Sequence, residues 1–198
     1  MHGPHAYTAR AMRWISVYVV GDIEVIGRIV LSQRDVLITL GVGILVLVPI
    51  ATIFAYRAHW SRTRTVCAGM CGASLALVPA TTLARGDALI EWGRSCGTQP
   101  GLSLDSSEAV LNALLFAPAV FFGVLALRRA TPIVVSALVF SAAIEAIQLV
   151  TALGTCQTAD VVRNVAGAVV AGGVAAFLLR VFAPTKSTSE AEPVRVDQ

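Results

Sequence analysis

Residues 133–153 read IVVSALVFSAAIEAIQLVTAL, and this stretch decides the class of fold. A helix needs about 20 residues to cross the roughly 30 Å hydrocarbon core of a bilayer, so the stretch is long enough to span a membrane. Its one ionisable residue is Glu145. An acid within an apolar span usually faces the interior of a helix bundle or a water-filled cavity, because exposing it to lipid is costly.

The chain contains further stretches of the same kind. One of them is short but ends at Arg128 and Arg129, whose long side chains can reach the membrane surface. The other expected spans cover residues 36–56, 65–84, 110–127 and 161–181. We therefore predict an all-α fold, a polytopic transmembrane helix bundle with about five spans.

Composition supports this class of protein. Of 198 residues, 56% are hydrophobic and 14% are charged, with a mean hydropathy of +0.76, which is too apolar for an ordinary soluble domain. The net charge of +3 comes from short basic clusters beside the apolar stretches rather than from one basic face. Aromatic residues make up only 7% and do not alternate with basic ones, so we expect no nucleic-acid partner.

The basic clusters predict how the chain is oriented in the membrane. Cations fill the loop at residues 57–64, occur at Arg128 and Arg129, and follow the last span. Cytoplasmic loops are enriched in Lys and Arg, so these places and the C-terminus should be cytoplasmic. Residues 85–109 and 154–160 should then face outward.

The N-terminal part of the chain is ambiguous. Residues 14–31 are apolar enough for a sixth span, but Asp22, Glu24 and Arg28 would each cost about 2.5–3.5 kcal/mol inside hydrocarbon. We favour a segment that lies on the membrane surface. The expected organisation is an interfacial segment, a transmembrane domain and a disordered cytoplasmic tail, over residues 1–35, 36–183 and 184–198.

Polar residues within the spans indicate where a site lies. Ser141 and Gln148 share a helix face with Glu145, at i−4 and i+3. Glu145 is either a hydrogen-bonded clamp between helices or a ligand-binding or proton-handling group, and both interpretations stay open. No catalytic residue can be assigned.

More polar residues stand where the third and last spans begin. Asp160 and Asn164 share a face, and Asp160 alone could be only a helix cap. Asn112 and Asn164 alone could make only interhelical hydrogen bonds. Together, residues from three helices converge on the outer half of the membrane, which predicts a ligand-binding site. Its candidate residues are Asn112, Ser141, Glu145, Gln148, Asp160, Arg163 and Asn164.

The four cysteines fall into two pairs. Cys96 and Cys156 lie in the two loops expected outside, where an oxidising environment permits a disulfide between them. Cys67 and Cys71 lie one turn apart in a span and are expected to be packing residues. There is no CxxC or HExxH motif and the histidines are scattered, so we expect no metal site and no cofactor.

Three blocks of sequence read NALLFAP at residues 112–118, SAAIEAIQ at 141–148 and DVVRNVAG at 160–167. Together they resemble the VanZ-like family of bacterial membrane proteins, and the resemblance covers about residues 102–181. Many members carry a motif similar to R-x-x-D-x-D-D before the last helix. At the four specified positions this chain has Gly154, Gln157, Ala159 and Asp160. Arg163 stands where members usually have an apolar residue.

The resemblance implies a protein of the bacterial plasma membrane, within the cell envelope, with a role in tolerance of glycopeptide or lipoglycopeptide antibiotics. We expect a non-enzymatic protein that binds a membrane lipid or a lipid-linked cell-wall component. A small proton-coupled transporter that uses Glu145 is one alternative. An intramembrane enzyme acting on a lipid head group is another, although no nucleophile and base can be identified. The sequence does not predict an oligomeric state.

Overall fold

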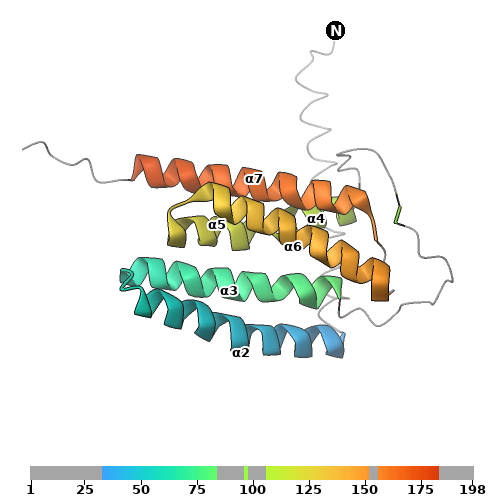
Figure 1. The fold of residues 1–198 in the computed structure, drawn as a ribbon, viewed down its shortest axis with the longest axis horizontal. Helices are drawn as coiled ribbons and strands as arrows, with labels where there is room; N and C mark the ends of the chain where they lie inside the picture. The colour runs from blue at the N-terminus through green and yellow to red at the C-terminus, as the bar shows by residue number, and fades with distance from the viewer. Residues whose placement is uncertain (1–32, 84–95, 98–105, 152–155, 183–198) are drawn as a thin grey trace, which may run out of the picture.

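The computed structural model describes residues 33–83, 96–97, 106–151 and 156–182. These residues form helices with roughly aligned axes, packed as a bundle (Figure 1). The helices are α2 (Arg34–Arg57), α3 (Arg62–Thr82), α4 (Ser107–Leu115), α5 (Ala117–Leu127), α6 (Ala130–Thr151) and α7 (Thr158–Val181). The described residues contain no strand beyond one isolated bridge, so the predicted all-α class is confirmed.

Within the described residues, five helical stretches are long and apolar enough to cross a membrane, in agreement with the five spans expected there. They are Arg34–Arg57, Arg62–Thr82, Ala109–Leu127, Ala130–Thr151 and Thr158–Val181. The expected interfacial segment and sixth span at the N-terminus, and the expected disordered tail, lie outside the described residues. Those three expectations stay predictions.

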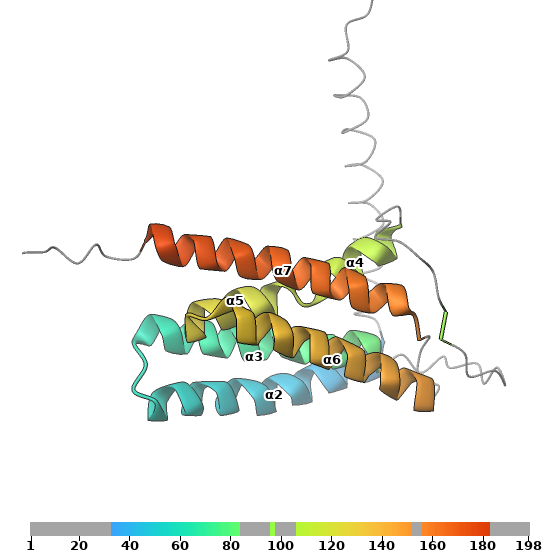
Figure 2. The same ribbon diagram turned by 45° about the horizontal axis from the view of Figure 1, so that its top comes forward.

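The third span, expected over residues 110–127, is divided into two helices. α4 ends at Leu115 and α5 begins at Ala117, with Phe116 between them. Pro118 has no backbone N–H and is favoured in the first turn of a helix, so it starts a new helix here. Figure 2 shows α4 turned away from the line of α5, which brings α4 beside α7.

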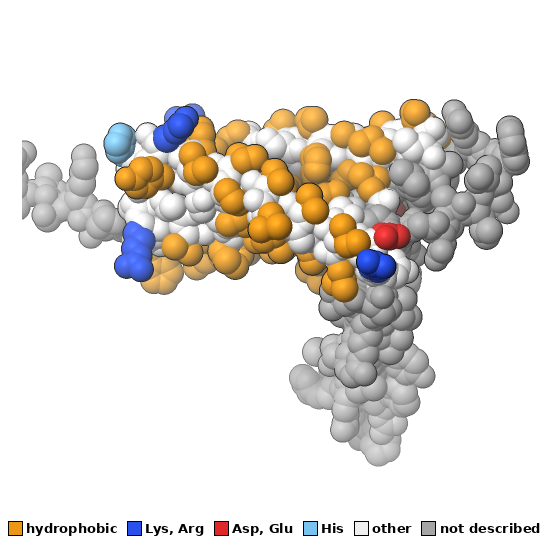
Figure 3. All heavy atoms as spheres, turned by 90° about the horizontal axis from the view of Figure 1, so that it is seen from below, with side chains coloured by type: hydrophobic (Ala, Val, Ile, Leu, Met, Phe, Trp, Pro, Cys, Tyr) orange, Lys and Arg blue, Asp and Glu red, His pale blue; other side chains and the backbone are white. Residues whose placement is uncertain are grey.

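The helices pack as two connected groups. α2 packs on α3, and α3 packs on α5. α7 contacts α4, α5 and α6, whereas α6 packs on α7 far more than on α5. Large apolar side chains such as Leu45, Val139 and Phe177 cover the outside of the bundle (Figure 3). An apolar exterior is what a bundle surrounded by lipid requires.

One end of the bundle is basic. Arg57, Arg62 and Arg64 lie where α2 is followed by α3, and basic side chains appear at one end of the bundle in Figure 3. Arg64 donates from Nε to the carbonyl of Ala126 at 2.7 Å, and its guanidinium lies 4.3 Å from the ring centroid of Trp60. The last carbonyls of a helix lack partners within it, so Arg64 ties α3 to the end of α5. Arg128, at φ 61°, then ends α5 in the left-handed conformation.

Small residues allow the closest helix approaches. A Cβ at Gly72 would lie 2.7 Å from the carbonyl oxygen of Leu47, so α2 and α3 are in backbone contact there. A Cβ at Gly167 would overlap the carbonyl of Ala113 on α4. Membrane helices use small residues in this way to bring backbones together. Gly167 therefore fixes α7 against α4.

We predict that Gly167→Ala destabilises the bundle, because α7 and α4 must separate to admit the methyl group. Overpacking of this kind costs about 1–3 kcal/mol. Gly173→Ala is the matched control, since Gly173 lies on the same helix with nothing within 4 Å of an added Cβ. Thermal stability in detergent, followed by size-exclusion chromatography, should fall for Gly167→Ala only. Equal behaviour of the two variants would contradict the proposed contact.

Candidate functional site

The polar face of α6 is turned into the bundle. Ser141, Glu145 and Gln148 are 1%, 9% and 9% exposed, respectively. Their spacing of four and three residues places them on one side of the helix, while Val139 and Val150 on other sides remain exposed. A polar stripe predicted from sequence alone is therefore buried in the protein and not in lipid.

Ser141 links α6 to α7. Asn164 donates from Nδ2 to the Ser141 hydroxyl oxygen at 2.9 Å, and both side chains are buried. The Asn164 amide oxygen is also buried and has no hydrogen-bond partner in the described part of the chain. The amide oxygen is therefore an unpaired hydrogen-bond acceptor inside the bundle.

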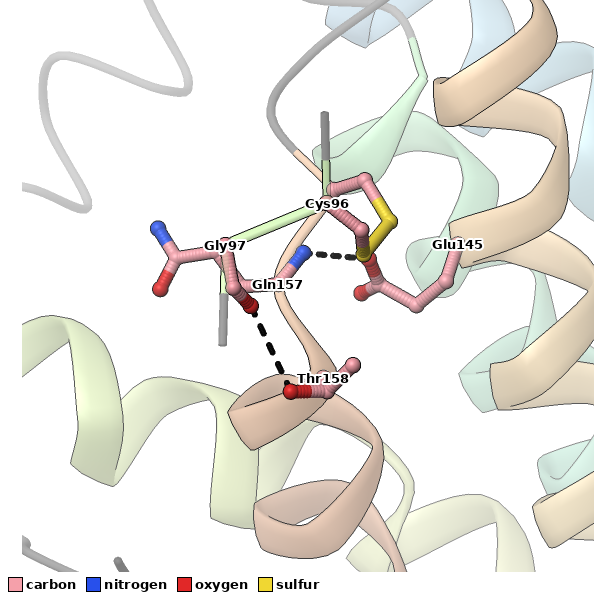
Figure 4. The surroundings of a disulfide bond; sticks show 6 residues. Cys96, Gly97, Glu145, Gln157 and Thr158 are labelled. Carbon is pink, nitrogen blue, oxygen red and sulfur yellow. Dashed lines mark hydrogen bonds between the residues drawn. A yellow bond between two sulfur atoms is a disulfide. The ribbon is translucent and has the colours of Figure 1, made fainter. Parts of the chain in front are cut away.

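Glu145 binds the backbone where α7 begins. Its carboxylate accepts a hydrogen bond from the N–H of Gln157 at 2.7 Å (Figure 4). Gln157 is the N-cap residue of α7, and helix N-termini favour negative charge. Within the described ranges no Lys or Arg forms an ion pair with Glu145. The carboxylate is therefore held by a backbone donor and not by a counter-ion.

Gln148 links α6 to the end of α3. It donates from Nε2 to the carbonyl of Thr82 at 3.2 Å. Its amide oxygen is buried without a hydrogen-bond partner among the residues described. This residue, like Asn164, has one half of its amide engaged and the other half unpaired.

Asp160 and Arg163 form an ion pair within α7. Arg163 Nη1 lies 3.0 Å from Asp160 Oδ1, and the side chains are 11% exposed for Arg163 and 16% for Asp160. Asp160 lies in the first helical turn, where an acid complements the helix dipole. The Nε of Arg163 is buried without a partner in the described ranges. One donor of the guanidinium therefore remains available.

Asn112 is the least connected of the predicted residues. It is half-buried on α4, and its side chain has no hydrogen bond within the part of the chain that the structure describes. Its neighbour Ala113 contacts Gly167, one turn beyond Asn164. The structure thus brings α4 to the site but joins Asn112 to none of the other candidate residues.

Cys96 and Cys156 form a disulfide, with their Cα atoms 4.7 Å apart, and Cys67 and Cys71 are free. Gly97 donates from N to the carbonyl of Cys156 at 2.9 Å, and Thr158 donates from N to the carbonyl of Gly97 at 3.1 Å. These bonds make the short parallel bridge between Gly97 and Gln157 (Figure 4).

Glu145 also approaches this disulfide. Its carboxylate and the two sulfurs lie within 4.8 Å of one another. Two thiolates and a carboxylate at this spacing could hold a metal ion, but sulfurs bonded to each other are not thiolate ligands. Sequence reasoning missed this contact and the role of Gln157, because a backbone N–H leaves no signal in the residue type.

An apolar groove of about 520 Å³ lies between α3, α5 and α6. Its walls include Cys71, Leu75, Phe116, Val120, Ile133 and Phe140. The groove exists because α6 packs chiefly on α7 and little on α5. Sequence patterns contain no signal for it, since every wall residue is also suited to contact with lipid or with another helix.

We predict that Cys96 and Cys156 are recovered joined to each other in protein isolated without reductant. Alkylation before digestion, followed by peptide mass mapping, should label Cys67 and Cys71 and leave the other two as one linked peptide. The physical reason is the bridge between Gly97 and Gln157, which holds the two cysteine segments together. Recovery of Cys96 and Cys156 as separately alkylated peptides would disprove this pairing.

Comparison with protein families identifies the chain. The family model VanZ/LLP1 matches residues 36–180, which is 145 of the 198 residues and runs from the first turn of α2 to the last turn of α7. No curated protein and no solved structure matches the chain. The resemblance seen in residues 102–181 is confirmed and extends through the first two spans. This membrane-spanning chain belongs to the VanZ/LLP1 family.

Proposed function

We propose that this protein binds a membrane lipid or a lipid-linked cell-wall component in the bacterial plasma membrane, and thereby modulates susceptibility to glycopeptide or lipoglycopeptide antibiotics. One observation carries the proposal. The atoms Gln148 Oε1, Asn164 Oδ1 and Arg163 Nε are buried without hydrogen-bond partners in the described part of a bundle whose exterior is apolar. An unpaired buried polar atom costs about 1–3 kcal/mol, and a bound ligand would remove that cost.

The surroundings of these atoms suit an amphiphilic ligand. Phe140 lines the apolar groove, and the next residue, Ser141, belongs to the polar face of the same helix. α6 therefore separates a surface that accepts hydrocarbon from a cluster of hydrogen-bonding groups. A lipid with a polar head and a long chain offers both kinds of surface.

The distribution of cations supports an outward-facing cluster. The loop at residues 57–64, Arg128 and Arg129 lie at the opposite end of the bundle from Gln157. Membrane proteins carry more Lys and Arg in their cytoplasmic loops than in their outer loops. The basic end therefore faces the cytoplasm, as does the C-terminus. The buried polar side chains of α6 and α7 then lie toward the outer side of the membrane, where cell-wall precursors and glycopeptides meet.

A proton-coupled transporter is less well supported. Such a carrier needs titratable groups that relay a proton across the membrane. The acids whose side chains are described are Asp35, Glu145 and Asp160, and all of them lie in the same half of the bundle. No acid among the described residues continues the path toward the basic end. We therefore favour binding over transport.

Orientation gives the first test. In a background with Cys67 and Cys71 replaced by alanine, we expect single cysteines at Ser61 and Arg129 to react with an impermeant maleimide only after the cells are opened. A cysteine at Asp35 should react in intact cells. The reason is the predicted cytoplasmic position of the basic end. Labelling of Ser61→Cys or Arg129→Cys from outside would reverse the orientation.

The second test uses Gln148→Met and Glu145→Gln, expressed at matched membrane levels in a susceptible bacterium. Met has a similar volume, and Gln148→Met removes both the unpaired oxygen and the hydrogen bond to the Thr82 carbonyl. These two effects offset, so thermal stability in detergent should change little. Gln148→Met should nevertheless reduce the amount of co-purifying lipid and the change in lipoglycopeptide susceptibility. Asp35→Asn is the control for Glu145→Gln, since it makes the same chemical change at the exposed start of α2.

Two results would defeat the proposal. In the first, the wild-type protein changes neither lipoglycopeptide susceptibility nor the binding of labelled drug to cells. In the second, Gln148→Met and Glu145→Gln retain wild-type lipid binding while Glu145→Ala is lost from the membrane. The polar cluster would then serve the architecture of the bundle and not a ligand.

A further inference from the structure

We propose that Cys96 and Cys156 are a redox-active pair that exchanges its disulfide with an external dithiol, and that Glu145 transfers the proton. The co-reactant is a protein or small molecule with two thiols. This activity is separate from the lipid binding proposed above and does not depend on it.

Distance and burial place the three groups for this reaction. The two sulfurs and the Glu145 carboxylate lie within 4.8 Å of one another (Figure 4). Both cysteines are half-buried, whereas Glu145 reaches them from α6 and is only 9% exposed. The cysteines are the more exposed members of the cluster, so we expect the incoming thiolate to approach from their side, while the proton-transfer group stays shielded from bulk water.

The two cysteines are held together independently of the S–S bond. The carbonyl of Gly97 accepts hydrogen bonds from Thr158 N at 3.1 Å and from the Thr158 hydroxyl at 3.3 Å. Gly97 in turn donates to the carbonyl of Cys156 at 2.9 Å. These bonds remain when the disulfide is reduced, so the thiols stay adjacent and the bond can form again. A disulfide whose only role was to close a loop of 60 residues would not need these backbone hydrogen bonds between the two cysteine segments.

Glu145 has the freedom that proton transfer requires. One hydrogen bond, from Gln157 N, holds the carboxylate in place, and no cation in the described ranges neutralises it. The charged group of α7 that acts on it is Asp160, which is itself paired with Arg163. Cys96 is another described neighbour of the Glu145 carboxylate. Glu145 can therefore gain or lose a proton without breaking an ion pair.

The reaction balances with the dithiol as reductant. A thiolate of the dithiol attacks one cysteine sulfur, the Cys96–Cys156 bond breaks, and the departing sulfur takes the proton of the Glu145 carboxyl group. The second thiol of the reductant gives its proton to the Glu145 carboxylate and, as thiolate, attacks the mixed disulfide. The second cysteine sulfur departs and takes that proton from Glu145. The dithiol loses two electrons and becomes a disulfide, and both cysteines become thiols. In the reverse direction the Glu145 carboxylate accepts the proton of the attacking cysteine.

The test follows reduction of full-length protein in detergent by dithiothreitol, in the background without Cys67 and Cys71. Mass-tagged maleimide reports the redox state of the pair, and the rate is divided by the thiolate concentration at each pH from 5 to 8. We expect the rate per thiolate to fall in the wild type as pH rises, because the Glu145 carboxyl group loses the proton that it donates. Glu145→Gln should be slower by about tenfold or more at low pH and lack this fall.

Asp35→Asn is the matched control and should keep the wild-type profile, since it removes an exposed carboxylate of α2 that is not part of the cluster of Glu145 and the two sulfurs. Removal of dithiothreitol and addition of its oxidised form should restore the disulfide in the wild type. Equal rates per thiolate in the wild type and Glu145→Gln would overturn the proposal. So would reduction that occurs only with loss of the monodisperse folded protein.

Two features keep the test decisive. If Glu145→Gln fails to fold, a wild-type rate per thiolate that does not change with pH still overturns the role of Glu145. Co-purifying lipid is measured on the same preparations. Loss of exchange with normal lipid content, or normal exchange with loss of lipid, then separates this activity from the lipid-binding function.

Discussion

The polar side chains of α6 must be enclosed by other helices, because lipid offers them no hydrogen-bond partner. This constraint determines which helices meet. Ser141 needs Asn164 of α7, Gln148 needs the last turn of α3, and Glu145 needs the backbone at the start of α7. α6 therefore leans toward α7 and the end of α3, and away from α5. The apolar groove is the space that this arrangement leaves beside α5.

Much of the fold could be predicted because a bilayer imposes simple rules on sequence. Hydrophobic stretches of about 20 residues mark spans almost directly, and the five observed helical stretches agree with those expected to within a few residues. The break at Phe116 was missed for a physical reason. A proline within an apolar stretch can bend a helix slightly or begin a new one, and here the contact between Gly167 and Ala113 holds α4 in a separate direction.

The site was predicted less completely than the fold. Spacing on α6 and α7 identifies Ser141, Glu145, Gln148 and Asn164 as facing inward, and all four are buried. Spacing cannot identify their partners, because Glu145 binds a backbone N–H and Gln148 a backbone carbonyl. Backbone groups are the same at every position, so only the path of the chain decides which of them a side chain meets.

The charges near the start of α7 differ from the usual family pattern, and these differences can be compared by their effect on Glu145. The chain lacks the Arg and two of the acids that many VanZ-like sequences carry before the last helix, and Gln157 and Ala159 stand in their places. Glu145 uses the main chain of Gln157, so this contact does not need an acidic side chain there. Additional carboxylates beside Glu145 would repel it.

The remaining acid of that pattern, Asp160, is neutralised by Arg163, a cation at a position that is usually apolar in the family. Substitution of two acids and gain of one cation together outweigh the loss of the Arg, so the net negative charge near the start of α7 is lower than in the usual family pattern. A loop with several acids would suit binding of a cation, whereas this arrangement leaves one buried carboxylate among amides and a paired arginine. In this member of the family, Glu145 is therefore held by hydrogen bonding and not by an ion pair at the end of the bundle where α7 begins.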